Sequence, residues 1–299
     1  MFLNNSTTVS IIIPAYNAQG FVNHALESAL HQTYNPIEVI VVDDGSTDDT
    51  FKICQGYSQF PNWKIYKLPR NRGARFAYNF GWLHSQGEFV MFLDADDIIF
   101  PKYVERIFGV MVVEEADIGF SNLYVMEGYN KTSLLCYGTP RHPAFNFAFG
   151  GPEETFPKTH MDLRQLILRT ASISPRSLYR RKLFETHGLE DHRLSISHDW
   201  LRNMAFVLGG AHCIFIDEPL GYYRVHNQGN SQKDPVASAV DALRAIDIVL
   251  SGELGELSSE EKSAITTLKK AYRSSLFQGL AQSDLTNSQI ISWLAEQKI

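Results

Sequence analysis

FVMFLDADD, residues Phe89–Asp97, joins a short apolar run to three aspartates within four positions. The apolar part has the composition of a buried strand, and neighbouring carboxylates repel one another unless a cation lies among them. Ligands of open α/β sheets bind at the carboxyl ends of the strands, where carboxylate oxygens suit Mg²⁺ or Mn²⁺. In an extended chain, Asp94 and Asp96 would point the same way. The alternative is a helix cap, with Asp97 ahead of a helix that Pro101 opens, and the stretch alone leaves both interpretations open.

Two other apolar runs also end in polar residues. Residues 37–42, IEVIVV, lead into Asp43 and Asp44 and then into the sequence GSTD. A turn and a capped helix explain the serine, threonine and aspartate of GSTD, but they do not explain two adjacent acids at the end of a strand. Residues 9–13, VSIII, lead into the sequence PAYN. We therefore expect three strands to bring polar groups to one edge of a sheet.

Four motifs, in order and spacing, resemble family 2 of the glycosyltransferases. They are VSIIIPAYN at 9–17, VVDDGSTDDT at 41–50, NRG at 71–73 and GEFVMFLDADD at 87–97. The resemblance continues more loosely to Ser231. It implies a GT-A fold, which is a Rossmann-like, mostly parallel sheet flanked by helices. It also implies a divalent metal, Mn²⁺ or Mg²⁺, and transfer of a sugar from a nucleotide sugar with inversion at the anomeric carbon.

Hydrophobic periodicity predicts strands and helices in alternation. The expected elements are a helix at 21–30, a strand at 63–68, a helix at 73–85, a helix after Pro101 and a strand at 117–126. This order predicts an α/β fold with a mostly parallel sheet and helices on both faces. From about residue 127 to 160 the pattern gives way to a segment rich in Pro, Gly and Phe, where we expect a long loop and acceptor specificity.

The chain divides into two expected parts. Residues 1–231 would form the GT-A domain, with a nucleotide-sugar half at 1–126 and an acceptor half at 127–231, and residues 232–299 would form a helical C-terminal extension. Helices are expected at 241–250, 262–280 and 288–297. The second of these carries an apolar stripe beside lysines and an arginine. The stripe would pack on its own domain or a second protomer, which we favour, or touch anionic lipid.

Composition agrees with a large α/β enzyme. The chain has 299 residues, of which 44% are hydrophobic, and a net charge of -6 that argues against nucleic acid as a main partner. Its cysteines, Cys54, Cys136 and Cys213, are odd in number and widely spaced, as expected for reduced core thiols. Neither a signal peptide nor a transmembrane run is visible in the sequence. We therefore expect a cytoplasmic protein, with peripheral association at the inner face of the membrane as an option.

Carried over residue by residue, the resemblance assigns roles to particular side chains. Asp44 would accept the imide N–H of a uracil-type base, Asp94 would approach the ribose and the donor sugar, and Asp96 would bind the metal. The residues expected to contact nucleotide or substrate are, in chain order, Pro14, Tyr16, Asn17, Asp44, Asn71, Gly73, Arg75, Asp94, Ala95, His198 and Arg224.

The catalytic base is expected in SHDWLRNM, residues 197–204. An acceptor hydroxyl is a poor nucleophile, so a carboxylate within hydrogen-bond reach must take its proton as the new bond forms. The family commonly has Glu-Asp and an aromatic residue here, and Asp199 matches that Asp. The alternative is that Asp199 only interacts with the dipole of a helix N-terminus. His198 departs from the family's Glu and would tune the base or contact the acceptor.

Two further places concern the diphosphate. LGYYRVHNQGNS, residues 220–231, resembles a family segment in which Arg224 would bind phosphate and His226 would bind the metal or phosphate. A satisfied structural histidine is the alternative for His226. The family's Ala-Arg-Asn reads Ala-Tyr-Asn here, with Tyr78 in place of the arginine, and Arg72 or Arg75 would have to replace it.

The sequence therefore predicts a metal-dependent inverting glycosyltransferase that adds a single sugar. The donor would be a nucleotide sugar, with UDP-sugars favoured, and the acceptor a hydroxyl of a glycan or lipid-linked glycan of the cell envelope. A homo-oligomer through the C-terminal helices is an option. The alternatives are a catalytically inactive nucleotide-sugar-binding scaffold subunit and a sugar nucleotidyltransferase. The latter is disfavoured because PAYNAQG, after the first strand, lacks the basic residue of a phosphate loop.

Overall fold

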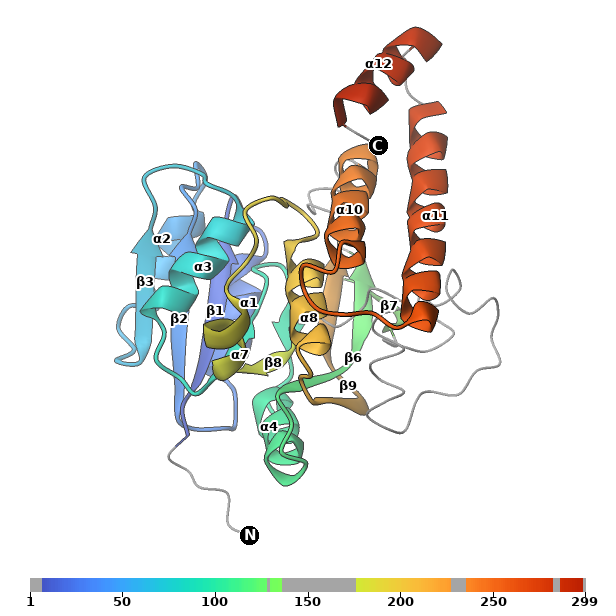
Figure 1. The fold of residues 1–299 in the computed structure, drawn as a ribbon. Helices are drawn as coiled ribbons and strands as arrows, with labels where there is room; N and C mark the ends of the chain where they lie inside the picture. The colour runs from blue at the N-terminus through green and yellow to red at the C-terminus, as the bar shows by residue number, and fades with distance from the viewer. Residues whose placement is uncertain (1–6, 128–129, 136–175, 227–234, 282–285, 298–299) are drawn as a thin grey trace.

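A computed structural model of the chain describes residues 7–127, 130–135, 176–226, 235–281 and 286–297. In this part of the chain, nine strands form one mixed sheet with helices packed on both faces (Figure 1). The strand order is β3-β2-β1-β4-β8-β6-β9-β5, and β7 pairs with β6 beside this path.

The first half of the sheet is parallel, as the sequence predicts. Strands β1 to β4 run in the same direction, with β2 and β4 on either side of β1, so that their carboxyl ends meet at one edge. Every residue of β1 and β4 is buried, which is why both read as continuous apolar runs. The elements are β1 Val9–Ala15, α1 Val22–Leu30, β2 Ile37–Asp43, α2 Thr50–Gln55, β3 Trp63–Lys67, α3 Ala74–His84 and β4 Phe89–Phe92.

The second half of the sheet contains antiparallel pairs. Strand β8 lies between β4 and β6 and runs antiparallel to both, while β9 runs parallel to β6. The short elements β5, β8 and α7 escaped the sequence analysis because two to six residues are too few to show a reliable periodic pattern. The elements are β5 Ile98–Ile99, α4 Tyr103–Val113, β6 Ile118–Glu127, β7 Asn130–Leu135, β8 Leu178–Arg180, α7 Lys182–His187, α8 His198–Leu208 and β9 Cys213–Val225.

The loop expected at 127–160 was wrong in part. Residues 130–135 form β7, which pairs with β6 in antiparallel orientation. The register of this pair shifts between Val125 and Met126. A polar sequence with threonine and serine gives no apolar alternation, so this strand carried no signal of its own. Residues 136–160 lie outside the described part of the chain.

The C-terminal helices are longer than their apolar patterns. Helix α10, Pro235–Leu250, and helix α11, Ser259–Ala281, lie side by side, and α12, Asn287–Gln297, lies at one end of this pair (Figure 1). The stripe of α11 is buried at Ile265, Leu268 and Leu276, so it packs on its own chain, as favoured above. Helix α10 also packs against α8. No described helix has the length and apolar character that crossing a membrane requires.

Both described cysteines agree with the expectation of reduced core thiols. Cys54 and Cys213 are buried and carry no disulfide. Burial raises the pKa of each thiol to about 12, which leaves them protonated and unreactive at neutral pH. Cys136 lies outside the described residues.

Candidate functional site

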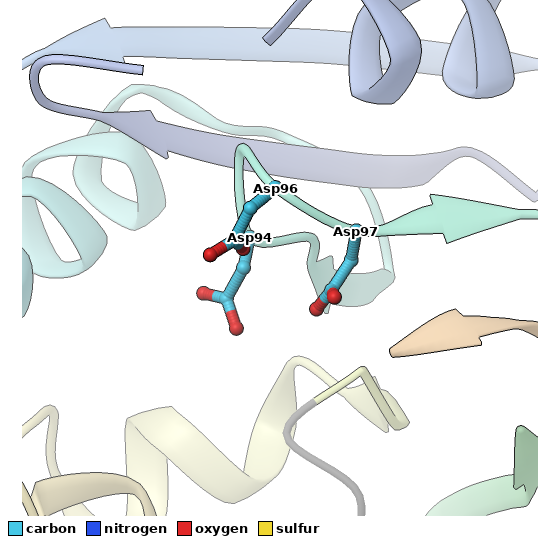
Figure 2. Close-up of side chains that lie close together, drawn as sticks. All are labelled: Asp94, Asp96 and Asp97. Carbon is cyan, nitrogen blue, oxygen red and sulfur yellow. The ribbon is translucent and has the colours of Figure 1, made fainter. Parts of the chain in front are cut away.

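The three aspartates of DADD lie on a turn that follows β4. The strand ends at Phe92, and the backbone N–H of Asp97 donates to the carbonyl of Asp94 at 3.1 Å. The expectation of an extended chain here was wrong. The turn nonetheless brings one carboxylate oxygen from each of Asp94, Asp96 and Asp97 within 4.8 Å of the others, and Figure 2 shows the three side chains projecting from it together.

Asp97 is a structural member of this group. Its side chain is fully buried, forms an ion pair with Arg176 and accepts a hydrogen bond from the backbone N–H of Arg224 at 2.9 Å. It does not cap the following helix, because α4 has Lys102 at its N-cap and no side-chain hydrogen bond there. Arg176 is 2% exposed and its Nη2 also lies 3.0 Å from Asp94 Oδ2. The sequence analysis missed Arg176 because no motif surrounds it.

Asp94 is bound on its other oxygen by Tyr78, the residue that replaces the family's arginine. The Tyr78 hydroxyl donates to Asp94 Oδ1. Burial, followed by the charge of Asp94, raises the pKa of Tyr78 well above its ordinary value, so the hydroxyl keeps its proton and remains a donor. Burial also raises the pKa of Asp94, against the lowering effect of Arg176.

Asp96 and His226 form the part of the site with a suitable donor set for a cation. Asp96 Oδ2 lies 2.9 Å from His226 Nε2, and the side chains are 29% and 14% exposed. The carboxylate oxygens of Asp94 and Asp96 are hard donors that suit Mn²⁺ or Mg²⁺, and the imidazole of His226 lies beside Asp96. Arg224 is buried, and its Nε donates to the carbonyl of Asp96 at 2.8 Å. It therefore supports the turn, and its contact with phosphate stays a prediction.

Asp44, at the end of β2, holds the NRG segment in place. Its Oδ1 accepts from the N–H of Arg72 at 2.9 Å and its Oδ2 from the N–H of Gly73 at 2.8 Å. Asn71 Oδ1 also accepts from Gly73 N–H at 2.9 Å. Burial raises the pKa of Asp44, and the two N–H donors oppose this effect. A carboxylate oxygen can accept more than one hydrogen bond, so the imide role of Asp44 stays a prediction.

Gly45 allows the NRG segment to approach this strand end. Its φ is +71°, and a Cβ there would lie 2.5 Å from the carbonyl carbon of Arg70. A larger residue at position 45 would both strain the backbone and push the segment away from Asp44. Position 45 therefore requires glycine both for its backbone conformation and for the close approach of the segment at Arg70.

The PAYN residues have different environments. Tyr16 is 44% exposed directly after β1, and its contact with a base stays a prediction. Asn17 has a φ of 47°, and its Oδ1 accepts from the N–H of Thr47 at 2.9 Å, so it joins the loop after β1 to the loop after β2. Pro14 is buried inside β1. Of the remaining candidates, Ala95 is 8% exposed in the aspartate turn and Arg75 is half-buried in the first turn of α3.

Asp199 lies in the first turn of α8. Its Oδ1 accepts from the N–H of Trp200 at 2.8 Å. Its charge contributes to raising the pKa of both Tyr78 and Asp94, so the three side chains share one electrostatic environment. The ring centroid of Tyr78, whose hydroxyl donates to Asp94, lies 5.6 Å from that of His198, so the fold brings the start of α8 close to the aspartate turn although more than a hundred residues separate them in the sequence.

Beside His198 lies a buried carboxylate that the sequence analysis missed. Glu190, in the loop between α7 and α8, has one oxygen 3.0 Å from His198 Nδ1 and its other oxygen paired with Arg202. The charges of Arg202 and His198 outweigh burial and lower the pKa of Glu190. The sequence LEDHR around it reads as an ordinary charged loop, so only its burial reveals the contact.

Sequence comparisons place the chain among glycosyltransferases. The sequence model of the family described as "Glycosyl transferase family 2" matches residues 10–188. The chain is 28% identical over 299 residues to "Uncharacterized glycosyltransferase RP339" of Rickettsia prowazekii, covering 98% of this chain and 86% of that protein. It is 37% identical over 129 residues to "Glycosyltransferase GlyA" of Streptococcus pneumoniae, covering 43% of this chain but only 18% of GlyA.

Solved structures with the same fold include two nucleotide-sugar complexes. S. aureus TarS in complex with UDP-GlcNAc superposes with a TM-score of 0.75 at 22% identity, covering 96% of this chain and 79% of that one. The mannosyltransferase PcManGT of Pyrobaculum calidifontis, in complex with GDP-Man and Mn²⁺, gives a TM-score of 0.61 at 17% identity, covering 96% and 79%. At these identities the likeness concerns the fold, and it confirms the expected GT-A-like architecture.

Proposed function

The chain belongs to glycosyl transferase family 2 and is a glycosyltransferase, and from this premise we propose that it is a metal-dependent, inverting enzyme that adds single sugars. Its donor is a nucleotide sugar, with UDP-sugars favoured. Its acceptor is a hydroxyl of a glycan or lipid-linked glycan of the cell envelope. The complex of TarS with UDP-GlcNAc supports a UDP-sugar donor through the shared fold.

One observation carries the proposal: Tyr78 links the two parts of the site, because its hydroxyl donates to Asp94 and its ring centroid lies 5.6 Å from that of His198, the residue before Asp199. In the proposed site Asp96 and His226, with Asp94 beside them, hold Mn²⁺ or Mg²⁺. When bound, the ion neutralises negative charge on the leaving diphosphate. The relative PcManGT contains Mn²⁺, and the acidic group here has the donor atoms for the same kind of ion.

The transfer itself is assigned to Asp199. Its carboxylate takes the proton of the acceptor hydroxyl while that oxygen attacks the anomeric carbon of the donor sugar. The bond between the anomeric carbon and the diphosphate oxygen breaks in the same step, and its electrons leave with the nucleoside diphosphate. A single displacement without an enzyme nucleophile inverts the anomeric configuration.

The nucleotide is assigned to the end of the parallel sheet. Tyr16 is exposed there and contacts the base in our proposal, while Asp44 accepts the imide N–H and holds the NRG segment. Arg75, in the first turn of α3, is the cation proposed for the diphosphate, because Arg72 stacks on Phe76 with 3.6 Å between its Cζ and the ring centroid. Pro14 supports this end of the sheet as a buried residue of β1, and Asn17 supports it through its hydrogen bond with Thr47.

We also propose the division of the chain into a GT-A domain at 1–231 and a helical extension at 232–299. The extension is tied to the site by Asp241 of α10. One oxygen of this buried carboxylate accepts the N–H groups of Ser195, Ile196 and Ser197 at 3.0, 2.7 and 2.8 Å. These residues lead directly into His198 and Asp199, so α10 helps to fix the start of α8.

The test is release of UDP from a panel of UDP-sugars with Mn²⁺ or Mg²⁺, measured with and without chelator. The metal-dependent glycosyltransferase proposed here should release UDP only with metal, and faster when a suitable acceptor is added. A scaffold subunit would bind the sugar nucleotide without releasing UDP, and a nucleotidyltransferase would instead produce UTP from the sugar nucleotide and pyrophosphate. The matched control is Asp247→Asn, which removes an exposed carboxylate that pairs with Lys269 on the extension.

A further inference from the structure

A buried ion pair adjoins the first turn of α8. Glu190 and His198 are each 5% exposed, and Glu190 Oε2 lies 3.0 Å from His198 Nδ1. The other oxygen of Glu190 pairs with Arg202, whose Nη2 donates to the Tyr179 hydroxyl at 3.0 Å. Each oxygen of this carboxylate therefore has its own cationic partner, as a buried charge requires.

Helix α3 holds both ends of this arrangement. The side-chain amide of Asn79 accepts from the N–H of Glu190 at 3.0 Å and donates to its carbonyl at 3.3 Å, which pins the Glu190 backbone. The preceding residue, Tyr78, has its ring centroid 5.6 Å from that of His198 and its hydroxyl on Asp94. A continuous set of contacts thus joins Glu190 to the aspartate turn.

The charges around His198 favour its protonated form. Burial lowers the pKa of His198, but the charges of Glu190 and Asp199 outweigh burial and Arg202, so its pKa is raised above 6.5. The charges of Arg202 and Asp199 on α8 act on the ring, Glu190 pairs with it from the preceding loop, and the Tyr78 ring lies beside it from α3. From α10, Asp241 binds the backbone just before it. Where the family commonly has a second carboxylate beside the base, this chain places an imidazole with a buried counter-ion.

We propose that Glu190 is a positioning residue for the transfer, holding His198 as an imidazolium that compensates and orients the carboxylate of Asp199. The inference rests on the proposed role of Asp199 as the base. Asp94 and Asp199 carry like charges in one site, and the imidazolium supplies an opposite charge next to Asp199. When His198 loses its proton, Asp199 loses this partner, and kcat falls as its geometry loosens.

The first experiment measures the protonation of His198 in the full chain by NMR titration of the histidine rings. Signals from the 10 histidines are distinguished with His198→Gln. We expect His198 to titrate above pH 6.5, and Glu190→Gln to lower its midpoint by about one pH unit or more, because an opposite charge at this distance is removed. The matched control is Asp191→Asn, which removes the neighbouring carboxylate that pairs with exposed Arg193 and should leave the midpoint in place.

The second experiment follows kcat and KM for the sugar nucleotide against pH. We expect the alkaline limb of kcat to move to lower pH in Glu190→Gln by the amount seen in the titration. KM and the metal-dependent UDP affinity should stay within twofold, because the donor side is untouched. Glu190→Asp keeps the charge and should restore part of the profile, which a purely structural loss would not do.

Three results would overturn the proposal. They are an unchanged His198 midpoint in Glu190→Gln, a shifted midpoint with an unchanged kcat profile, and a wild-type midpoint below 6.5. Glu190→Gln could fail to bind UDP because Arg202 loses its partner. In that case the wild-type titration and the Glu190→Asp variant test the proposal in its place. The titration needs neither acceptor nor transfer, so it stays informative even if the proposed sugar transfer is not found.

Discussion

The hydroxyl of Tyr78 donates a hydrogen bond to Oδ1 of Asp94, 16 residues later in the chain. Arg176 Nη2 lies 3.0 Å from the other oxygen. Both oxygens of this carboxylate therefore have a protein donor, which sets its orientation before a ligand binds. The resemblance predicts arginine at position 78, so a neutral donor stands here in place of a cation, and Arg176 supplies the positive charge from the turn before β8.

Tyr78→Phe should weaken binding of UDP-sugars more than binding of UDP. The change removes only the hydroxyl that orients Asp94, which we assign to the ribose and donor sugar. A hydrogen bond to a charged group contributes about 1.5–3 kcal/mol, so calorimetry with Mn²⁺ should show a roughly tenfold or greater loss for the UDP-sugar. Tyr57→Phe is the control, because its hydroxyl bonds Asn23 and Glu27 away from the site. Equal losses for UDP and UDP-sugar would show that Tyr78 does not act through the sugar.

Asp96→Asn should reduce metal-dependent UDP binding and leave the fold intact. The amide has no charge to hold a hard cation, and the nearby His226 loses its carboxylate partner. Calorimetry with UDP and increasing Mn²⁺ should show a higher metal requirement, while thermal unfolding without metal stays close to that of Asp247→Asn. If UDP affinity depends on Mn²⁺ equally in mutant and wild type, Asp96 is not a metal ligand.

Asp44→Ala should weaken UDP binding by roughly ten to a hundredfold, corresponding to about 1.5–3 kcal/mol for a lost charge-assisted hydrogen bond. The same change also frees the N–H groups of Arg72 and Gly73, so weaker binding alone does not identify the imide contact. N3-methyl-UDP, which lacks the imide N–H, separates the two effects. Wild type should prefer UDP over the methylated analogue, and Asp44→Ala should lose that preference. Wild type that binds both equally would leave Asp44 with its structural role alone.

Asp199→Asn should bind UDP and metal normally but transfer sugar roughly a hundred to ten thousandfold more slowly, because the amide cannot take the acceptor's proton. The product of the wild-type reaction should have the anomeric configuration opposite to the donor's by NMR. Asp191→Asn is a suitable control, since it also removes a carboxylate from the approach to α8. Near-normal turnover by Asp199→Asn, or a product with retained configuration, would overturn the mechanism.

The Glu190–His198 pair should stabilise the fold most strongly between about pH 4.5 and 6.5. The pKa of Glu190 is lowered in the folded chain, so its contribution is present above about 4.5 and is lost as pH falls through the lowered value. The pKa of His198 is raised, so its contribution is present below about 6.5 and is lost as pH rises through the raised value. The Tm difference between wild type and His198→Gln, measured against pH, should be largest in this window. A difference that grows towards alkaline pH would contradict the ion pair.

Local patterns predicted much of the framework. The strands near residues 9, 37, 63 and 89 and the helices between them are confirmed, because apolar periodicity and turn residues act within short windows. Short elements such as β5 and β8 were missed, and β7 was taken for loop, because two to six residues are too few to show a clear apolar period. Helix α10 begins at Pro235, before the expected start at residue 241, because its first residues lie outside the apolar stripe from which the helix was predicted.

The candidate site divides in the same way. The aspartates after β2 and β4, and the base candidate Asp199, were found from residue type, position and resemblance. Arg176 and Glu190 were not, although each binds a residue that was. Their surroundings in the sequence are an ordinary strand start and a charged loop, so burial against a partner is their only distinguishing property.

By itself, the sequence determined that a parallel sheet would bring carboxylates to one edge. The reason is that each apolar strand is followed directly in the sequence by the aspartates and turn residues that end it. Only the tertiary structure decided which side chains hold those carboxylates. Tyr78 and Arg176 reach Asp94 across 16 and 82 residues of chain, and Asp241 reaches the start of α8 from the C-terminal extension. Such contacts depend on how elements that are distant in the sequence pack together. The residues next to a buried charge in the sequence therefore do not indicate which side chain will pair with it.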